Sequence, residues 1–258
     1  MLTSAPVGGL DSLMFDPQGN IVYDSFGGGT VWRYNVTTHA NTQVTGAFAG
    51  PADMALEPGG GTALISNASG STITRINLAT SSAVGSLSVG ARPDGIIYDA
   101  AGALYAVLGL QEVVQIDPAT GMILKTIANL LQPDGLTYDA ATNKLYVASD
   151  AGGFYTIPTD LSSATFTPVA GSPVFDGIAS QGNDLFIVVR GQGGLLYDLA
   201  ANSVVETSPT IVGADDIAPV AGLGSQGSQP VPEPNSLGLL AAGLLLFGTV
   251  AARRRHFR

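Results

Sequence analysis

Aspartates recur along this sequence in similar contexts and at nearly constant spacing. Successive members of the set are 40 to 42 residues apart. The set consists of Asp11, Asp53, Asp94, Asp134, Asp176 and Asp216. Carboxylates that converge on one point supply the oxygen ligands that Ca²⁺ prefers. If the repeating units surround a shared axis, these side chains could form a ring that holds a cation, although the sequence does not identify a metal.

The same aspartates also have a purely structural explanation. An aspartate at a turn accepts hydrogen bonds from nearby backbone N–H groups, and this role would be repeated in every unit. A functional site, in contrast, usually breaks the symmetry of a repeat. The regular spacing therefore favours the structural role, and the cation ring is the alternative.

The segments between the aspartates predict four short strands in each unit. In the unit that begins at Asp94, strands are expected over 95–98, 103–108, 112–116 and 122–127. Residues 117–121 (Asp-Pro-Ala-Thr-Gly) predict a turn, because proline fixes φ and glycine accepts positive φ. Five units are complete, and a sixth stops at Val220. We therefore expect an all-β protein, a β-propeller of four-stranded blades that are buried only by stacking on their neighbours.

A propeller commonly closes by combining strands from both ends of the chain in one blade, which removes an exposed sheet edge. Only ten residues precede Asp11, and they contain neither a basic start nor a sustained apolar run. The expectation is that this sequence lacks the N-terminal part of a six-bladed protein, including its export signal.

Composition and charge narrow the possible functions. The chain has 34 glycines, 15 prolines and 12% charged residues, which is typical of many tight turns between short strands. Residues 1–230 contain six basic and nineteen acidic side chains, so this part would repel nucleic acid. There is no cysteine, which excludes disulfides and thiolate chemistry.

The last part of the sequence differs in character from the repeats. Residues 222–230 predict a flexible linker, and 237–252 contain no charge. As a helix, these sixteen residues would span about 24 Å, slightly less than the bilayer core. Arg253, Arg254 and Arg255 follow directly, which predicts a transmembrane helix with its C-terminus in the cytoplasm and the repeats outside.

The repeat signatures resemble the NHL, YncE and SMP-30/gluconolactonase group of β-propellers. The resemblance rests on motifs such as Pro93-Asp94-Gly95-Ile96 and covers about residues 11–220. It implies the propeller fold and, as an alternative function, a metal-dependent hydrolase of the SMP-30/gluconolactonase type. Such hydrolases hold their metal with an uneven set of acidic and amide ligands. The ends of the predicted second strands do not supply a convergent set; they are Asp24, Asn67, Leu108, Asp150 and Arg190.

The tail resembles the PEP-CTERM sorting signal. The resemblance rests on Pro232-Glu233-Pro234, the short apolar span and the terminal arginine cluster, in that order. It implies recognition by an exosortase, removal of the span near the Pro-Glu-Pro motif, and release into the cell envelope or the extracellular polysaccharide matrix. Pro232, Glu233 and Pro234 would then be a recognition element with no catalytic role.

Together these patterns predict a propeller at 1–221, a linker at 222–230 and a sorting signal at 231–258. The function they favour is an exported binding or structural protein of the envelope or extracellular matrix. Its expected partners are an exosortase, the membrane through the C-terminal helix, and extracellular polysaccharide. An enzyme is the less favoured possibility, and no cofactor is required, with Ca²⁺ as the one candidate.

Overall fold

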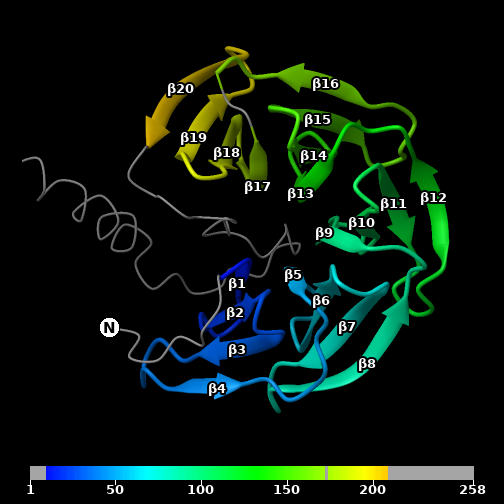
Figure 1. Ribbon diagram of the computed structural model, residues 1–258, viewed down its shortest axis with the longest axis vertical. Helices are drawn as coiled ribbons and strands as arrows, with labels where there is room; N and C mark the ends of the chain where they lie inside the picture. The colour runs from blue at the N-terminus through cyan, green and yellow to red at the C-terminus, as the bar shows by residue number, and fades with distance from the viewer. Residues whose placement is uncertain (1–9, 172–173, 209–258) are drawn as a thin grey trace, which may run out of the picture. The chain divides into compact units, whose positions relative to one another are not determined.

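Twenty short strands make up the part of the chain that the structure, a computed structural model, describes: residues 10–171 and 174–208. They form five antiparallel four-stranded sheets, each built from four consecutive strands (Figure 1). Across these described ranges there is no helix. The expected sixth unit, the linker, the apolar span at 237–252 and the first nine residues lie outside the described residues.

The five blades follow one another along the chain. Blade one contains β1 (Leu13–Phe15), β2 (Ile21–Ser25), β3 (Thr30–Tyr34) and β4 (Asn41–Gln43). Blade two contains β5 (Pro51–Leu56), β6 (Thr62–Asn67), β7 (Thr72–Asn77) and β8 (Ser82–Ser88). Blade three contains β9 (Pro93–Tyr98), β10 (Leu104–Leu108), β11 (Glu112–Ile116) and β12 (Ile123–Ile127). Blade four contains β13 (Pro133–Asp139), β14 (Lys144–Ser149), β15 (Gly153–Pro158) and β16 (Thr165–Pro168). Blade five contains β17 (Phe175–Gln181), β18 (Asp184–Val189), β19 (Gly193–Asp198) and β20 (Ser203–Ser208).

The predicted propeller with five complete four-stranded units is confirmed. The third blade agrees with its expected strands to within two residues at each boundary. In every blade the first strand lies nearest the centre of the array and the fourth lies at the outside (Figure 1). Neighbouring innermost strands are in contact, from β1 through β5, β9 and β13 to β17. The starts of these strands are therefore gathered around one axis.

The hydrophobic core lies between the blades, where four clusters of buried side chains join successive pairs of sheets. Strand β6 shows how one strand serves two interfaces. Ala63 and Ile65 belong to the cluster shared with blade one, whereas Leu64 belongs to the cluster shared with blade three. Side chains alternate between the two faces of a strand, so a blade with neighbours on both sides has apolar residues at consecutive positions.

Glycine in the Pro-Asp-Gly motif allows the innermost strands to approach one another closely. A Cβ atom on Gly95 would lie 2.7 Å from the carbonyl oxygen of Asp134, in the next blade. A Cβ atom on Gly135 would lie 2.5 Å from the carbonyl oxygen of Asp176. Any larger side chain would collide with backbone at these positions. The repeated glycine thus reflects how tightly the strands pack around the axis.

Candidate functional site

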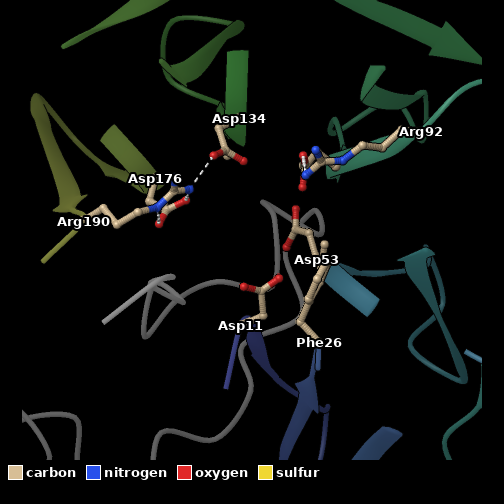
Figure 2. Close-up of a pocket in the computed structure, with 12 residues that line it drawn as sticks. Asp11, Phe26, Asp53, Arg92, Asp134, Asp176 and Arg190 are labelled. Carbon is tan, nitrogen blue, oxygen red and sulfur yellow. Dashed lines mark hydrogen bonds and ion pairs between the residues drawn. The ribbon is translucent and has the colours of Figure 1, made fainter. Parts of the chain in front are cut away.

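Five blades contribute side chains to one cavity where their innermost strands begin. We call it the axial cavity; it has a volume of about 380 Å³ (Figure 2). Its wall consists of Asp11, Phe26, Ala52, Asp53, Arg92, Asp94, Gly95, Asp134, Gly135, Asp176, Gly177 and Arg190. Five of the six aspartates singled out in the sequence are therefore brought together. The sixth, Asp216, lies outside the described residues.

The strand registers place most of these aspartates at equivalent positions. In blades two to five, the first residue of the innermost strand pairs with the last residue of the second strand. The four pairs are Pro51–Asn67, Pro93–Leu108, Pro133–Ser149 and Phe175–Val189. Asp94, Asp134 and Asp176 each follow directly after the first residue of their strand. Asp53 follows one position later, where those three blades have glycine.

In blade one, the aspartate occupies the same position as in blades three to five. Leu13 pairs with Tyr23, two residues before the end of its second strand, as Ile96 pairs with Ala106 in blade three. Asp11, two residues before Leu13, is therefore equivalent to Asp94. The displaced member is Asp53 alone, and residue spacing did not reveal this.

Asp53 has a structural role in the contact between blades two and three. Its Oδ1 accepts a hydrogen bond of 2.7 Å from the backbone N–H of Met54. Its Oδ2 accepts one of 2.6 Å from the backbone N–H of Ile96, in the next blade. This is the backbone-binding role that the sequence favoured for the whole set.

Asp134 and Asp176 have a different partner, the guanidinium of Arg190. Arg190 donates to both oxygens of Asp176, from Nη2 to Oδ1 at 2.6 Å and from Nε to Oδ2 at 2.8 Å. Nη2 also reaches Oδ2 of Asp134 in blade four at 3.2 Å, and Nη1 lies 3.6 Å from Oδ2 of Asp150. Figure 2 shows this side chain between Asp176 and Asp134. One arginine therefore links carboxyl groups of two blades at the cavity wall.

Arg92 forms the second arginine pair of the cavity. Its Nη2 donates to Oδ2 of Asp94 at 2.7 Å, and the arginine side chain is 44% exposed whereas that of Asp94 is 9% exposed. Arg92 faces Arg190 across the cavity in Figure 2. Positive charge is thus built into the aspartate ring at two points.

Burial shifts the protonation of the ring carboxyls. It raises the pKa of Asp94 to about 6, with the charges of Asp176 and Asp150 adding to the rise and that of Arg92 opposing it. Burial, together with the charges of Asp94 and Asp176, raises the pKa of Asp134 well above its usual range. The neutral form of Asp134 is therefore favoured more strongly than in an exposed aspartate.

Arg190 donates to Asp134 over 3.2 Å, which is longer than its two contacts with Asp176. The ion pair of Arg190 is with Asp176, whose hydrogen bonds chiefly raise the pKa of the arginine. Burial also raises the pKa of Asp150.

The residues at the ends of the second strands do not form a single set. Phe26, Asp150 and Arg190 each follow directly after the last residue of β2, β14 and β18. Asn67 and Leu108 are themselves the last residues of β6 and β10. Of these, Phe26 and Arg190 are in the cavity wall.

Asp24 and Asn67, which the sequence placed at the ends of second strands, form hydrogen bonds away from the cavity. Asp24 is buried and accepts hydrogen bonds from the backbone N–H and the hydroxyl of Ser12, at 3.1 and 2.7 Å. The Nδ2 of Asn67 donates to the hydroxyl of Thr74 at 2.9 Å. Within residues 10–171 and 174–208, no group of three or more His, Cys, Asp or Glu side chains has an arrangement suited to a metal ion.

Sequence reasoning missed Phe26 and Arg92 as site residues, and it counted Arg190 only among the second-strand ends that supply no convergent set of metal ligands. The signal that could have found them is variation between blades at equivalent positions. At the position of Arg92, blades two, four and five have Gly50, Gln132 and Val174. At the position of Phe26 and Arg190, the others have Ala68, Gly109 and Asp150. Equivalent positions can be identified only from the strand registers.

The tail contains a motif that is known from other proteins. Residues 230–255 match the PEP-CTERM protein-sorting motif. This chain carries a PEP-CTERM sorting signal. The recognition of the tail from its sequence is confirmed, and the motif implies an exported protein that an exosortase recognises and processes. The side chains of Pro232, Glu233, Pro234, Arg253, Arg254 and Arg255 lie outside the described residues, so their individual roles stay predictions.

Solved structures resemble the propeller of this chain. Virginiamycin B lyase from Staphylococcus aureus matches with a TM-score of 0.63 and 13% identity, over 78% of this chain and 70% of that chain. A streptogramin B lyase matches with a TM-score of 0.67 and 12% identity, over 82% of this chain and 72% of that chain. A chain of a nidogen/laminin complex matches with a TM-score of 0.66 and 18% identity, over 76% of this chain and 78% of that chain. At such identities the likeness shows the fold alone. No curated protein sequence matches this chain.

Among the residues that the structure describes, no helix is long and apolar enough to cross a membrane. The span at 237–252, where the sequence predicts that helix, is outside the described ranges.

Proposed function

We propose that this exported protein is a binding component of the cell envelope or extracellular matrix and holds its ligand in the axial cavity. The observation that carries the proposal is that side chains of five blades converge on one cavity of about 380 Å³. Small-molecule sites commonly occupy about 300–1,000 Å³ and combine a few polar groups with apolar surface. The cavity has carboxyl groups, two guanidinium groups and the ring of Phe26.

The arginine pairs favour binding over the hydrolase alternative. A metal-dependent hydrolase needs carboxylates that converge on a cation with an open coordination position. In the axial cavity, Arg190 already lies between Asp134 and Asp176, and Arg92 is paired with Asp94. A metal ion bound beside these guanidinium groups would be repelled by them.

Extracellular polysaccharide is the proposed class of partner, and nucleic acid is not. The six basic and nineteen acidic side chains of residues 1–230 would repel a polyphosphate. A neutral or cationic polymer meets no such barrier. The sorting signal supports a site of action outside the cytoplasmic membrane.

We also propose that the span at 237–252 anchors the protein transiently in the cytoplasmic membrane, with the arginine cluster inside. The sixteen uncharged residues and the three arginines that follow them support this orientation. The Pro232-Glu233-Pro234 motif would then lie on the outer side, where an exosortase can reach it.

Anchoring and processing can be tested in one experiment. The full chain, with an export signal placed before Met1 and an epitope tag at each end, is expressed in bacteria with and without an exosortase. Without the enzyme, both tags should stay in the membrane fraction, and external protease should remove only the N-terminal tag. With the enzyme, the C-terminal tag should be lost from the mature protein.

A matched substitution separates the motif from the propeller. Glu233→Ala should block processing, and Glu206→Gln on β20 should leave it unchanged. Protection of the N-terminal tag from external protease would contradict the proposed orientation. Equal processing of the wild type and Glu233→Ala would contradict the role of the motif.

A further inference from the structure

Arg92, Phe26 and Arg190 in the wall of the axial cavity occupy positions at which the described blades differ from one another. Arg92 stands where other blades have Gly50, Gln132 or Val174. At the position directly after the second strand, blades one and five have Phe26 and Arg190, whereas the other three blades have alanine, glycine and aspartate. Positions that only support a blade tend to be similar in every blade, because each blade has the same packing to satisfy. Three variable positions that meet in one cavity therefore indicate a local role such as ligand recognition.

The charge of the cavity favours a cationic ligand. Its wall has five carboxyl groups and two guanidinium groups. Acidic groups thus outnumber basic groups among the described residues of the wall. Such an excess in a partly enclosed site attracts cations.

Phe26 favours an organic cation over a metal ion. The residue is 40% exposed although it is a large apolar side chain. It reaches from blade one toward blade two, since a Cβ atom on Gly50 would lie 3.0 Å from its Cε2. Figure 2 shows it close to Asp11 and Asp53. An aromatic ring beside carboxylates can contact an ammonium group or the C–H face of a sugar ring, whereas a hydrated metal ion gains little from it.

Hydrogen-bonding capacity further narrows the ligand. Carboxylates accept hydrogen bonds from ammonium and hydroxyl groups, and guanidinium groups donate to hydroxyl oxygens. Arg92 uses Nη2 toward Asp94 and is nearly half exposed, which leaves donors that can face a ligand. The volume of about 380 Å³ is large enough for one sugar ring with water.

We propose that the axial cavity recognises an amino sugar, such as a glucosamine unit of a polysaccharide, with its ammonium group near Asp11 and Asp53 and its ring against Phe26. This inference rests on the proposed binding function and specifies the chemistry of the ligand. It depends on neither export nor processing.

Isothermal titration calorimetry on the full chain in detergent micelles tests the inference. The probes are glucosamine trisaccharide, N-acetylglucosamine trisaccharide, a uronic acid trisaccharide and CaCl₂. The glucosamine trisaccharide should bind. The N-acetylated compound has the same ring without the positive charge and should bind at least about tenfold more weakly, because an ionic hydrogen bond is lost. The uronic acid and CaCl₂ should give no binding heat.

Two cavity variants and one control locate the site. Asp11→Asn removes one carboxylate charge, and Phe26→Ala removes the ring. Each should weaken binding of the glucosamine trisaccharide by about tenfold. Asp184→Asn, which neutralises a carboxylate on β18 outside the cavity wall, should bind as the wild type does. A thermal melt of each variant checks that it is folded.

Three results would overturn the inference. Equal affinity for the charged and the N-acetylated trisaccharide would remove the cationic requirement. Unchanged affinity in both folded cavity variants would place the sugar elsewhere. Calcium binding that is lost in Asp11→Asn would make the cavity a metal site. Because purified protein is used, none of these results depends on sorting or membrane insertion.

Discussion

Arg190 and Asp176 form a two-point ion pair at the wall of the axial cavity, with distances of 2.6 and 2.8 Å between their nitrogen and oxygen atoms. The same guanidinium extends to Asp134 in the neighbouring blade. Fixed geometry of this kind orders the charges of the cavity before any ligand enters.

Replacement of Arg190 should loosen the contact between blades four and five. Arg190→Ala leaves Asp176 without its two-point partner, and we expect the free energy of unfolding to fall by about 1 kcal/mol; the loss is limited because Arg190 is half exposed. Arg190→Lys should recover only part of this, because an ammonium group cannot form the same paired contact. Urea unfolding measures the effect. Lys144→Ala is the control, and an equal loss there would contradict a specific contribution of Arg190.

Stability should fall as pH rises from about 5 to 8. The folded protein keeps protons on Asp94, whose pKa is about 6, and on Asp134, whose pKa is higher still. An unfolded aspartate has a pKa of about 3.9 and has already lost its proton in this range. The folded state thus binds more protons, so stability is greatest below about pH 4 for these groups and is lost as pH passes the folded pKa.

Urea titrations at pH 5 and pH 8 measure this dependence. Asp94→Asn cannot ionise and should show a smaller difference between the two pH values than the wild type. An equal difference in both proteins would contradict the raised pKa of Asp94.

A methyl group at Gly135 should be poorly tolerated. The Cβ atom of Gly135→Ala would lie 2.5 Å from the carbonyl oxygen of Asp176, so the strands β13 and β17 would have to separate. We expect a loss of about 1–3 kcal/mol in the free energy of unfolding. Gly194→Ala on β19 is the control, because its Cβ atom would meet nothing closer than 3.6 Å. Equal stability of the two variants would show that the innermost strands can move apart freely.

Removal of a side chain between blades should cost much more than removal of one at the outer edge. Leu104 is fully buried in the cluster between blades two and three, and Leu104→Ala should lower the free energy of unfolding by about 2–5 kcal/mol. Leu124 on β12 is 53% exposed, and Leu124→Ala should change it by less than about 0.5 kcal/mol. Chemical denaturation provides both values, and similar losses would contradict burial between stacked sheets.

Much of the fold could be predicted because its signals are local in the sequence. Residues 117–121 predicted the turn before β12, since proline, aspartate and glycine restrict the backbone there whatever surrounds them. The period near 41 residues predicted blades, because a sheet of four short strands cannot bury both faces alone. The tail could also be recognised, since its motif, apolar span and arginines are contiguous.

The cavity was only partly predictable for the opposite reason. Matching by residue type placed Asp53 in the same series as Asp94, but strand pairing shifts it by one position. That shift points its carboxylate toward the backbone of Ile96. The spacing of residues along the chain can be read from the sequence, but the register of strand pairing decides which residues are neighbours in space.

From its own residues, the sequence determined the strand pattern, the repeated units and the sorting signal, because each depends on groups that are close along the chain. Only the tertiary structure decided which charges meet. Arg190 contacts Asp134, 56 residues away, because stacking of blades brings the starts of distant strands to one axis. No local sequence pattern specifies such a contact. It forms only when the sheets stack and bury their apolar faces against one another.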